Sequence, residues 1–244
     1  EDGIRDVERS RGLGDVYKRQ IYSHTHYVEY LYKKLGDDAL KLLEIPPGKI
    51  VLKADKDKDL FNNPHVRIYH EYFLKYWSPK RVPCALVLPC TAVKPYSLSA
   101  THRFAMTRLK KLGISHIVEK YVISEPMVLV PQELEIYYPI ANYDYHPKFL
   151  NQEAKRKFIS LLSKALTKLK VHEIVVAVLP RHHMWIFKRA LHNSPLDKVI
   201  LIDYGRLAFK NISRGIDILY EYASCLLYTS PSPRDLSTSR MPSS

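Results

Sequence analysis

Cysteines, long apolar runs and the common nucleotide-binding motifs are scarce or missing in this sequence of 244 residues. The three cysteines form no CxxC pair, which argues against a disulfide framework and against a cysteine-rich zinc site. No run approaches the roughly 18 to 20 apolar residues of a membrane-spanning helix, and the opening residues do not have the basic, apolar and small-residue pattern of a signal peptide. GxGxxG and GxxxxGKS/T are missing, so no standard dinucleotide or nucleoside triphosphate site is indicated. We therefore expect a cytoplasmic protein with no metal and no organic cofactor, in which any functional cysteine is a free thiol.

The two ends of the chain do not look like parts of a folded domain. Residues 1–20 show no sustained apolar period, and residues 226–244 are rich in Ser, Pro and Thr. Both strings resemble translated sequencing-library adapters, so we interpret them as non-native and set them aside; authentic flexible termini are the alternative. Between them we expect a helical and strand segment at residues 21–62 and a core domain at residues 63–225. On this interpretation the chain is an internal fragment of a longer protein.

The sequence is basic, with a formal charge of +13 that belongs almost entirely to its interior, because the charges at the two ends nearly cancel. A polyanionic partner is the natural inference, and nucleic acid is the first candidate. A helix expected at residues 99–112 would present a basic outer face suited to phosphates, formed by Arg103, Arg108, Lys110 and Lys111. A basic surface that binds nothing is the alternative.

Apolar runs and amphipathic stretches alternate through the interior of the chain. Buried strands are expected at residues 84–88, 116–124, 173–179 and 198–203, and helices at residues 64–76, 99–112, 151–170, 181–192 and 213–223. A further short helix is expected at residues 131–138, and a short strand at residues 49–54. In the helix expected at residues 64–76, Asn63 is the expected N-cap and Tyr76 is expected to face inward. Strands alternating with helices predict right-handed β-α-β units, hence an α/β fold of three layers (α/β/α) around a mainly parallel central sheet.

Reactive side chains crowd the loop that follows the strand expected at residues 84–88. They are Cys90, Lys94, Tyr96, Ser99 and His102. Ligands of open parallel sheets bind beyond the carboxyl ends of the strands, so this loop is the first candidate site. His102 should lie in the first helical turn and face the same crevice as Cys90, where a helix N-terminus favours a thiolate. A chance mixture in a surface turn is the alternative. The pair His182-His183, after another strand end, is a weaker candidate.

The pattern PC-x3-KPY-x2-S-x2-H, from Pro89 to His102, resembles the signature of the core domain of archaeosine synthase, the archaeal relative of tRNA-guanine transglycosylase. The similarity continues through the segment ISEPMVLVPQELEIYYPIANYD. It implies that the substrate is tRNA whose D-loop carries 7-cyano-7-deazaguanine, and that free lysine is added to the nitrile. The product would be an amidine, which a partner radical enzyme later converts to archaeosine.

For this substrate, the residue types in the motif permit a chemical hypothesis. Cys90 would attack the nitrile carbon to form a thioimide, His102 would act as base or lower the pKa of the thiol, and Lys94 would stabilise the thiolate or contact phosphate. The remaining substrate-binding candidates are Pro89, Tyr96, Ser99, Glu133, Glu135, Tyr143 and Asp144. Ordinary exposed helix acids are the alternative for Glu133 and Glu135. Two other functions stay open: a non-catalytic tRNA-binding module, and a nucleobase-pocket enzyme of glycosylase-like fold.

Overall fold

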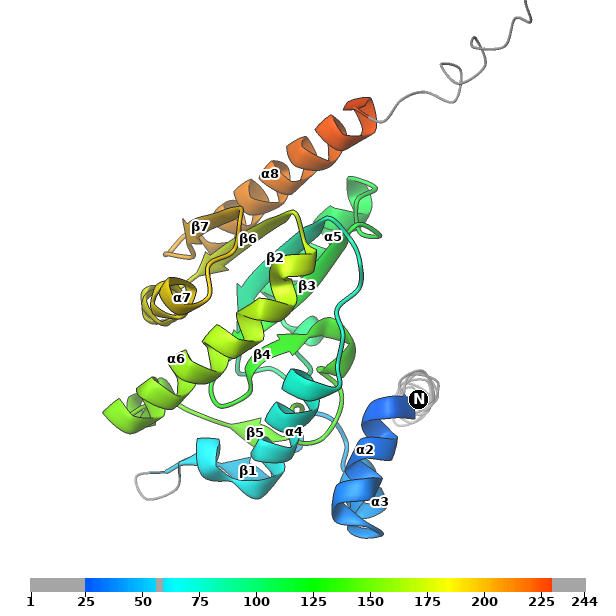
Figure 1. Ribbon diagram of the computed structural model, residues 1–244, viewed down its shortest axis with the longest axis vertical. Helices are drawn as coiled ribbons and strands as arrows, with labels where there is room; N and C mark the ends of the chain where they lie inside the picture. The colour runs from blue at the N-terminus through cyan, green and yellow to red at the C-terminus, as the bar shows by residue number, and fades with distance from the viewer. Residues whose placement is uncertain (1–24, 56–58, 230–244) are drawn as a thin grey trace, which may run out of the picture.

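A five-stranded sheet forms the centre of the computed structural model, which describes residues 25–55 and 59–229 (Figure 1). The strand order is β4-β3-β2-β6-β7. All neighbours are parallel except β3 and β4, which are antiparallel. The strands are β2 (Cys84–Pro89), β3 (Val118–Ser124), β4 (Val128–Pro131), β6 (Ile174–Leu179) and β7 (Val199–Asp203). The predicted α/β fold with a mainly parallel sheet is confirmed.

Helices cover both faces of this sheet, because successive side chains of a strand point to opposite faces. Leu86 of β2 packs in one apolar cluster with residues of α5 (Ala100–Lys111) and α8 (Ala208–Thr229). Its neighbour Val87 belongs to the opposite cluster, with residues of α6 (Gln152–Leu166) and α7 (Arg181–Asn193). The sheet is therefore buried on both faces, which explains why its strands are almost continuously apolar in sequence.

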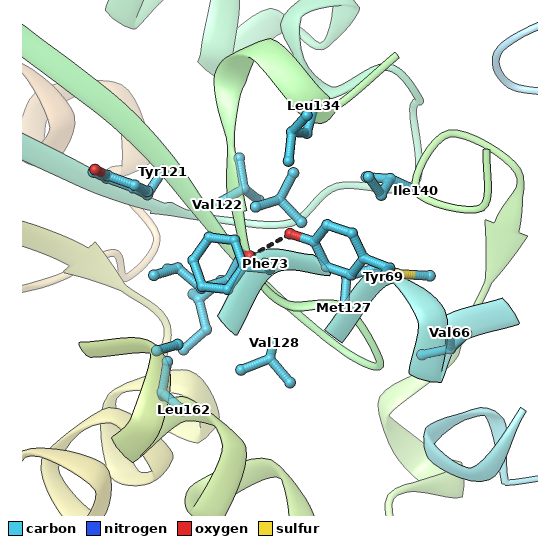
Figure 2. Close-up of a cluster of buried hydrophobic side chains, with 14 of the residues drawn as sticks. Val66, Tyr69, Phe73, Tyr121, Val122, Met127, Val128, Leu134, Ile140 and Leu162 are labelled. Atoms are coloured by element: carbon cyan, nitrogen blue, oxygen red, sulfur yellow. Dashed lines mark hydrogen bonds between the residues drawn. The ribbon is translucent and has the colours of Figure 1, made fainter. Parts of the chain in front are cut away.

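The N-terminal segment packs beside the sheet and contributes to the same core. It contains α2 (Thr25–Leu35), α3 (Asp38–Leu43), β1 (Leu52–Lys53), the 3-10 helix η1 (Leu60–Asn62) and α4 (Pro64–Lys75). The Asn63 side chain accepts hydrogen bonds from the amides of His65 and Val66, which is the predicted N-cap of α4. Figure 2 shows how Tyr69 of this helix lies among apolar side chains and donates its hydroxyl hydrogen to the Leu129 carbonyl, 2.6 Å away.

Several local predictions are wrong. Residues 131–138 do not form an α-helix: β4 ends at Pro131, and one short 3-10 helix, η3 (Gln132–Leu134), follows. The expected strand at residues 49–54 is reduced to β1, which pairs in parallel with β5 (Tyr143–Asp144). Tyr76 was expected to face inward with the buried side of α4, but it lies beyond the helix end and is 60% exposed.

Three more 3-10 helices connect the larger elements: η2 (Tyr96–Leu98), η4 (Pro147–Phe149) and η5 (Thr167–Val171). The C-terminal segment expected from residue 226 begins inside α8, which continues to Thr229. Residues 1–20, and the rest of the expected C-terminal segment, lie outside the described residues. Among the described helices, none has the length and apolar character needed to cross a membrane.

Candidate functional site

The strand order reverses at β2, and a cavity of about 310 Å³ lies at the carboxyl ends of the strands there. From β2 the chain crosses through α5 to β3 on one side, whereas β6 and β7 lie on the other side. Crossovers that leave in opposite directions open a crevice between them, which is where open α/β sheets bind ligands. Segments that follow β2, β3, β6 and β7 line this cavity, together with the segment that contains β5.

Cys90 reaches the cavity from the end of β2, and a carboxylate and an imidazole stand beside its sulfur. The Sγ atom lies 3.9 Å from Oε2 of Glu125, which follows β3. Nε2 of His183, in the first turn of α7, is 3.0 Å from both carboxylate oxygens of Glu125. Nε2 of the more exposed His182 is 3.8 Å from one of them. The thiol can therefore pass its proton to a carboxylate that an imidazole orients.

The sequence predicts that a helix N-terminus favours a thiolate at Cys90, but the surroundings of this thiol raise its pKa. Burial and the charge of Glu125 raise the pKa of the Cys90 thiol to about 12. Burial of Glu125 acts to raise the pKa of its carboxyl group, but the contacts with His183 and then His182 outweigh this effect and lower it. The site thus keeps a protonated thiol beside an ionised carboxylate, instead of a thiolate stabilised by a helix dipole.

Lys94 also lines the cavity, together with Tyr143 and Asp144. Its Nζ atom is 4.2 Å from the centroid of the Tyr143 ring, which is a cation–π distance. Burial lowers the pKa of Lys94, while the charge of the Asp144 carboxylate opposes this shift. Gly48, with φ of +90°, packs against the Lys94 backbone, where an added Cβ would lie 2.8 Å from the Lys94 carbonyl oxygen. Only glycine suits this contact between the N-terminal segment and the site.

Tyr96 and Ser99 are not among the residues that line the cavity. The Tyr96 hydroxyl is buried and bonds to the hydroxyls of Ser124 and Tyr143, which also bond to each other. Ser99 is buried, precedes α5 and donates its hydroxyl hydrogen to the Tyr96 carbonyl oxygen, 2.8 Å away. Of these residues Tyr143 lines the cavity, as Pro89 does. Tyr96 therefore holds the Tyr143 hydroxyl beside the cavity, and Ser99 holds the backbone of Tyr96.

His102 does not line the cavity around Cys90. Its Nε2 donates to the Pro89 carbonyl oxygen at 3.0 Å, and its Nδ1 accepts from Nζ of Lys120 at 3.3 Å. Burial and the neighbouring ammonium lower the pKa of His102 to about 3, so the ring stays neutral. Both ring nitrogens are occupied, and the predicted role as a base toward Cys90 does not match this geometry. His102 fixes the end of β2 on α5.

Glu133 and Glu135 lie at a second cavity, of about 450 Å³, which does not include Cys90. Nζ of Lys120 is 3.3 Å from Oε2 of Glu135 in a buried ion pair. Glu133 accepts from the Trp77 indole at 2.8 Å. The structure therefore separates these carboxylates from Asp144, with which they were grouped as substrate contacts. They are not the exposed helix acids of the alternative interpretation either.

The four basic residues expected to contact RNA are not equally available. Nη2 of Arg108 is 2.5 Å from a carboxylate oxygen of Asp217 in α8. Lys110 and Lys111 are in the last turn of α5, and Arg103 is exposed near its start. Because α5 begins beside the loop after β2 and rises about 1.5 Å per residue, its last turn lies roughly 15 Å farther from the cavity.

Glu125 is the site residue that sequence reasoning missed. It stands alone after a strand and before Pro126, so no spacing marks it as functional. The available signal was its place at the carboxyl end of β3, the same position that Cys90 has on β2. His183 was recognised as a candidate because it follows a strand end, and the structure places it on Glu125.

Cys90, Glu125 and His183 are also the one group, within residues 25–55 and 59–229, whose donor atoms lie close enough to share a metal ion. The atoms are within 4.8 Å of one another, and sulfur, imidazole nitrogen and carboxylate oxygen are zinc ligands. In this geometry the Glu125 carboxylate is already held by His183. A metal ion would have to replace those two hydrogen bonds.

The chain is similar to several archaeal proteins. Archaeosine synthase subunit alpha of Methanosarcina acetivorans is 29% identical over 162 residues, which are 66% of this chain and 25% of that protein. Archaeosine synthase of Methanocaldococcus jannaschii is 27% identical over 230 residues, 90% of this chain and 36% of that protein. The chain thus spans between a quarter and about a third of the length of these curated relatives.

Similarity to solved structures is more distant. The crystal structure of AF0587, a protein of unknown function, aligns with a TM-score of 0.48 and 22% identity, covering 63% of this chain and 49% of that chain.

The model of a domain of unknown function, DUF5591, matches residues 66–208. These residues include all five strands of the central sheet and the cavity segments from Pro89 to Tyr204. Because the match covers more than half of the chain, the protein belongs to the DUF5591 domain family.

Proposed function

We propose that this domain forms the amidine in archaeosine synthesis, by adding the side-chain amine of lysine to the nitrile of 7-cyano-7-deazaguanine in the D-loop of tRNA. The observation that carries the proposal is the Cys90 thiol in a cavity, 3.9 Å from a carboxylate that His183 holds in place. Curated relatives named archaeosine synthase support the choice of substrate. The resulting amidine would then be the substrate of a partner radical enzyme.

The first step joins the enzyme to the nitrile. The Cys90 sulfur attacks the nitrile carbon while its proton passes to Glu125, and Glu125 returns the proton to the nitrile nitrogen. One S–C bond forms, the carbon–nitrogen triple bond becomes a double bond, and the product is a thioimidate. Because the pKa of the thiol is raised, the proton has to leave during the attack, and the adjacent carboxylate is placed to accept it.

The second step releases the amidine. The neutral amine of lysine attacks the thioimidate carbon, loses a proton to the Glu125–His183 pair, and the C–S bond breaks. The departing sulfur takes that proton and the thiol is restored. The sum of both steps adds one amine to one nitrile, so no oxidant or reductant is needed. Lys94 and Asp144, which also line the cavity, supply charges of both signs for the carboxylate and the amino group of the incoming lysine.

Nucleoside mass spectrometry tests this proposal. Incubation of the chain with cyano-modified tRNA and lysine should convert the nitrile nucleoside to the lysine amidine. Cys90→Ser should abolish conversion, and the matched variant Cys225→Ser, which changes an exposed cysteine on α8, should leave it intact. Full amidine formation by Cys90→Ser would exclude the covalent route.

The same experiment separates the two alternative functions. A binding module would bind tRNA and leave the nitrile unchanged. A glycosylase-like enzyme would release free base, whereas the proposed reaction keeps the glycosidic bond. Either result contradicts the proposal.

A further inference from the structure

The outer face of α7 is basic, and the helix begins at the catalytic cavity. Pro180 before the helix and His182 in its first turn line that cavity. The 13 residues of α7 include no Asp or Glu. Arg181, Lys188 and Arg189 are exposed, and none of them forms an ion pair with a residue that the structure describes. A helix with unpaired cations and no acids has a surface suited to polyanions.

An exposed tryptophan interrupts these charges. Trp185 is 46% exposed, and the Arg189 guanidinium carbon lies 5.2 Å from the centroid of its ring. The spacing of His182, Trp185 and Arg189 is three and four residues, so the three side chains form one stripe along the helix. The stripe starts at the cavity mouth. An aromatic face next to arginine is the combination that stacks unpaired bases and contacts their phosphates.

We propose that this stripe, with Arg181 and Lys188, is the surface that binds the RNA substrate; this inference rests on the proposed function. An unpaired nucleotide next to the modified one stacks on Trp185, and the flanking phosphates contact the three cations. The N-terminus of α7 points toward the cavity and adds partial positive charge where the strand enters. RNA approaches along α7, which places the modified base over Cys90.

The face of α5 is the competing surface, and its geometry is less suitable. Arg108 is neutralised by Asp217. Lys110 and Lys111 are at the far end of the helix from the cavity, and no exposed aromatic residue lies among the described residues of α5. A nucleotide bound there could not reach Cys90 without a long span of RNA.

Tryptophan fluorescence gives a direct test, because the chain has two tryptophans and the other, Trp77, is only 5% exposed. Titration of the 244-residue chain with tRNA that lacks the nitrile should quench the emission of Trp185. Trp185→Phe should remove the quenching and keep the Trp77 signal, and Trp185→Ala should weaken binding by about tenfold, the loss of one stacked base. Circular dichroism should show unchanged helix content in both variants.

A matched pair of charge reversals tests the phosphate contacts. Lys188→Glu/Arg189→Glu should weaken tRNA binding by at least about tenfold and reduce the slope of log K against log salt by about two. Lys110→Glu/Lys111→Glu makes the same change in net charge on α5 and should alter affinity by less than about twofold.

Two results would overturn the inference. One is an equal loss of affinity in the α5 and α7 pairs, which would mean that RNA responds only to net charge. The other is quenching of Trp185 by polyglutamate as strongly as by tRNA, which would assign the surface to an acidic protein. Binding is measured here without the nitrile. A chain that binds tRNA through α7 but makes no amidine would therefore refute the proposed function and leave this inference standing.

Discussion

The Cys90 thiol should react slowly with iodoacetamide at neutral pH, although it lines a cavity. Burial and the Glu125 carboxylate raise its pKa to about 12. At pH 8 about one such thiol in ten thousand is ionised, against about one in four for an ordinary cysteine with a pKa of about 8.5. The thiolate fraction alone therefore slows alkylation by about 2,000-fold.

A more basic thiolate is also a stronger nucleophile, and this recovers part of the loss. With a Brønsted coefficient of about 0.45, a difference of roughly 3.5 pKa units increases intrinsic reactivity about 40-fold. The net expectation is alkylation about 50-fold slower than that of an ordinary exposed thiol. N-acetylcysteine alkylated in the same buffer provides the reference rate of an ordinary thiol, and mass spectrometry of tryptic peptides measures the rate at Cys90.

The pH dependence identifies the cause. The rate at Cys90 should still be increasing above about pH 10, because the thiol titrates above that value. Glu125→Gln removes one of the two causes of the shift, and each unit by which the pKa falls should accelerate alkylation about threefold at pH 8. If Cys90 instead reacts as fast as the reference thiol, or its rate reaches a plateau near neutral pH, then the thiolate is already formed and Glu125 is not needed as a base.

Three further predictions concern the buried charges and the possible metal ligands. Lys120→Met should lower the free energy of unfolding in urea by about 3–5 kcal/mol, because it leaves the buried Glu135 carboxylate without its ion-pair partner. The double variant Lys120→Met/Glu135→Gln should recover part of this loss. A double variant as unstable as Lys120→Met alone would contradict the pairing. Glu119 is 4% exposed, and burial raises its pKa from 4.5 to about 7. The Glu119 carboxyl group ionises at a lower pH in the unfolded chain than in the folded chain. Increasing the pH from 4.5 to 7 should therefore lower the free energy of unfolding by up to about 3 kcal/mol. This decrease should be missing in Glu119→Gln. Finally, dialysis against EDTA should leave amidine formation unchanged, since His183 already holds the Glu125 carboxylate; activity that is lost and then restored by Zn²⁺ would instead assign the Cys90 group to a metal.

The larger elements could be predicted because their sequence periods and caps agree. The apolar run of β6 and the three-and-four spacing of α6 predict a strand and a helix in nearly the observed positions. Asn63 and Pro64 mark the start of α4. β4 could not be predicted in this way: it has four residues, and its antiparallel pairing with β3 depends on contacts that local patterns do not contain.

The site was predicted in part, because strand ends can be placed from sequence but side-chain directions cannot. Cys90 and Lys94 do line the cavity. His102 follows in the same motif, but the first turn of α5 directs its ring toward Lys120 and the Pro89 carbonyl. Glu125 and His183 are 58 residues apart in the chain, and only the pairing of β2 with both β3 and β6 brings their strand ends together.

The reversal of strand order at β2 has a consequence for how this site can change over evolution. The cavity is lined by the connections after β2, β3, β6 and β7 and by the segment that contains β5, while the register of the sheet is set by its apolar strands. Substitutions or insertions in one connection can therefore alter which ligands the cavity accepts without loosening the core. The fold separates the residues that are free to vary from those that keep the domain folded, and new specificities can arise one loop at a time.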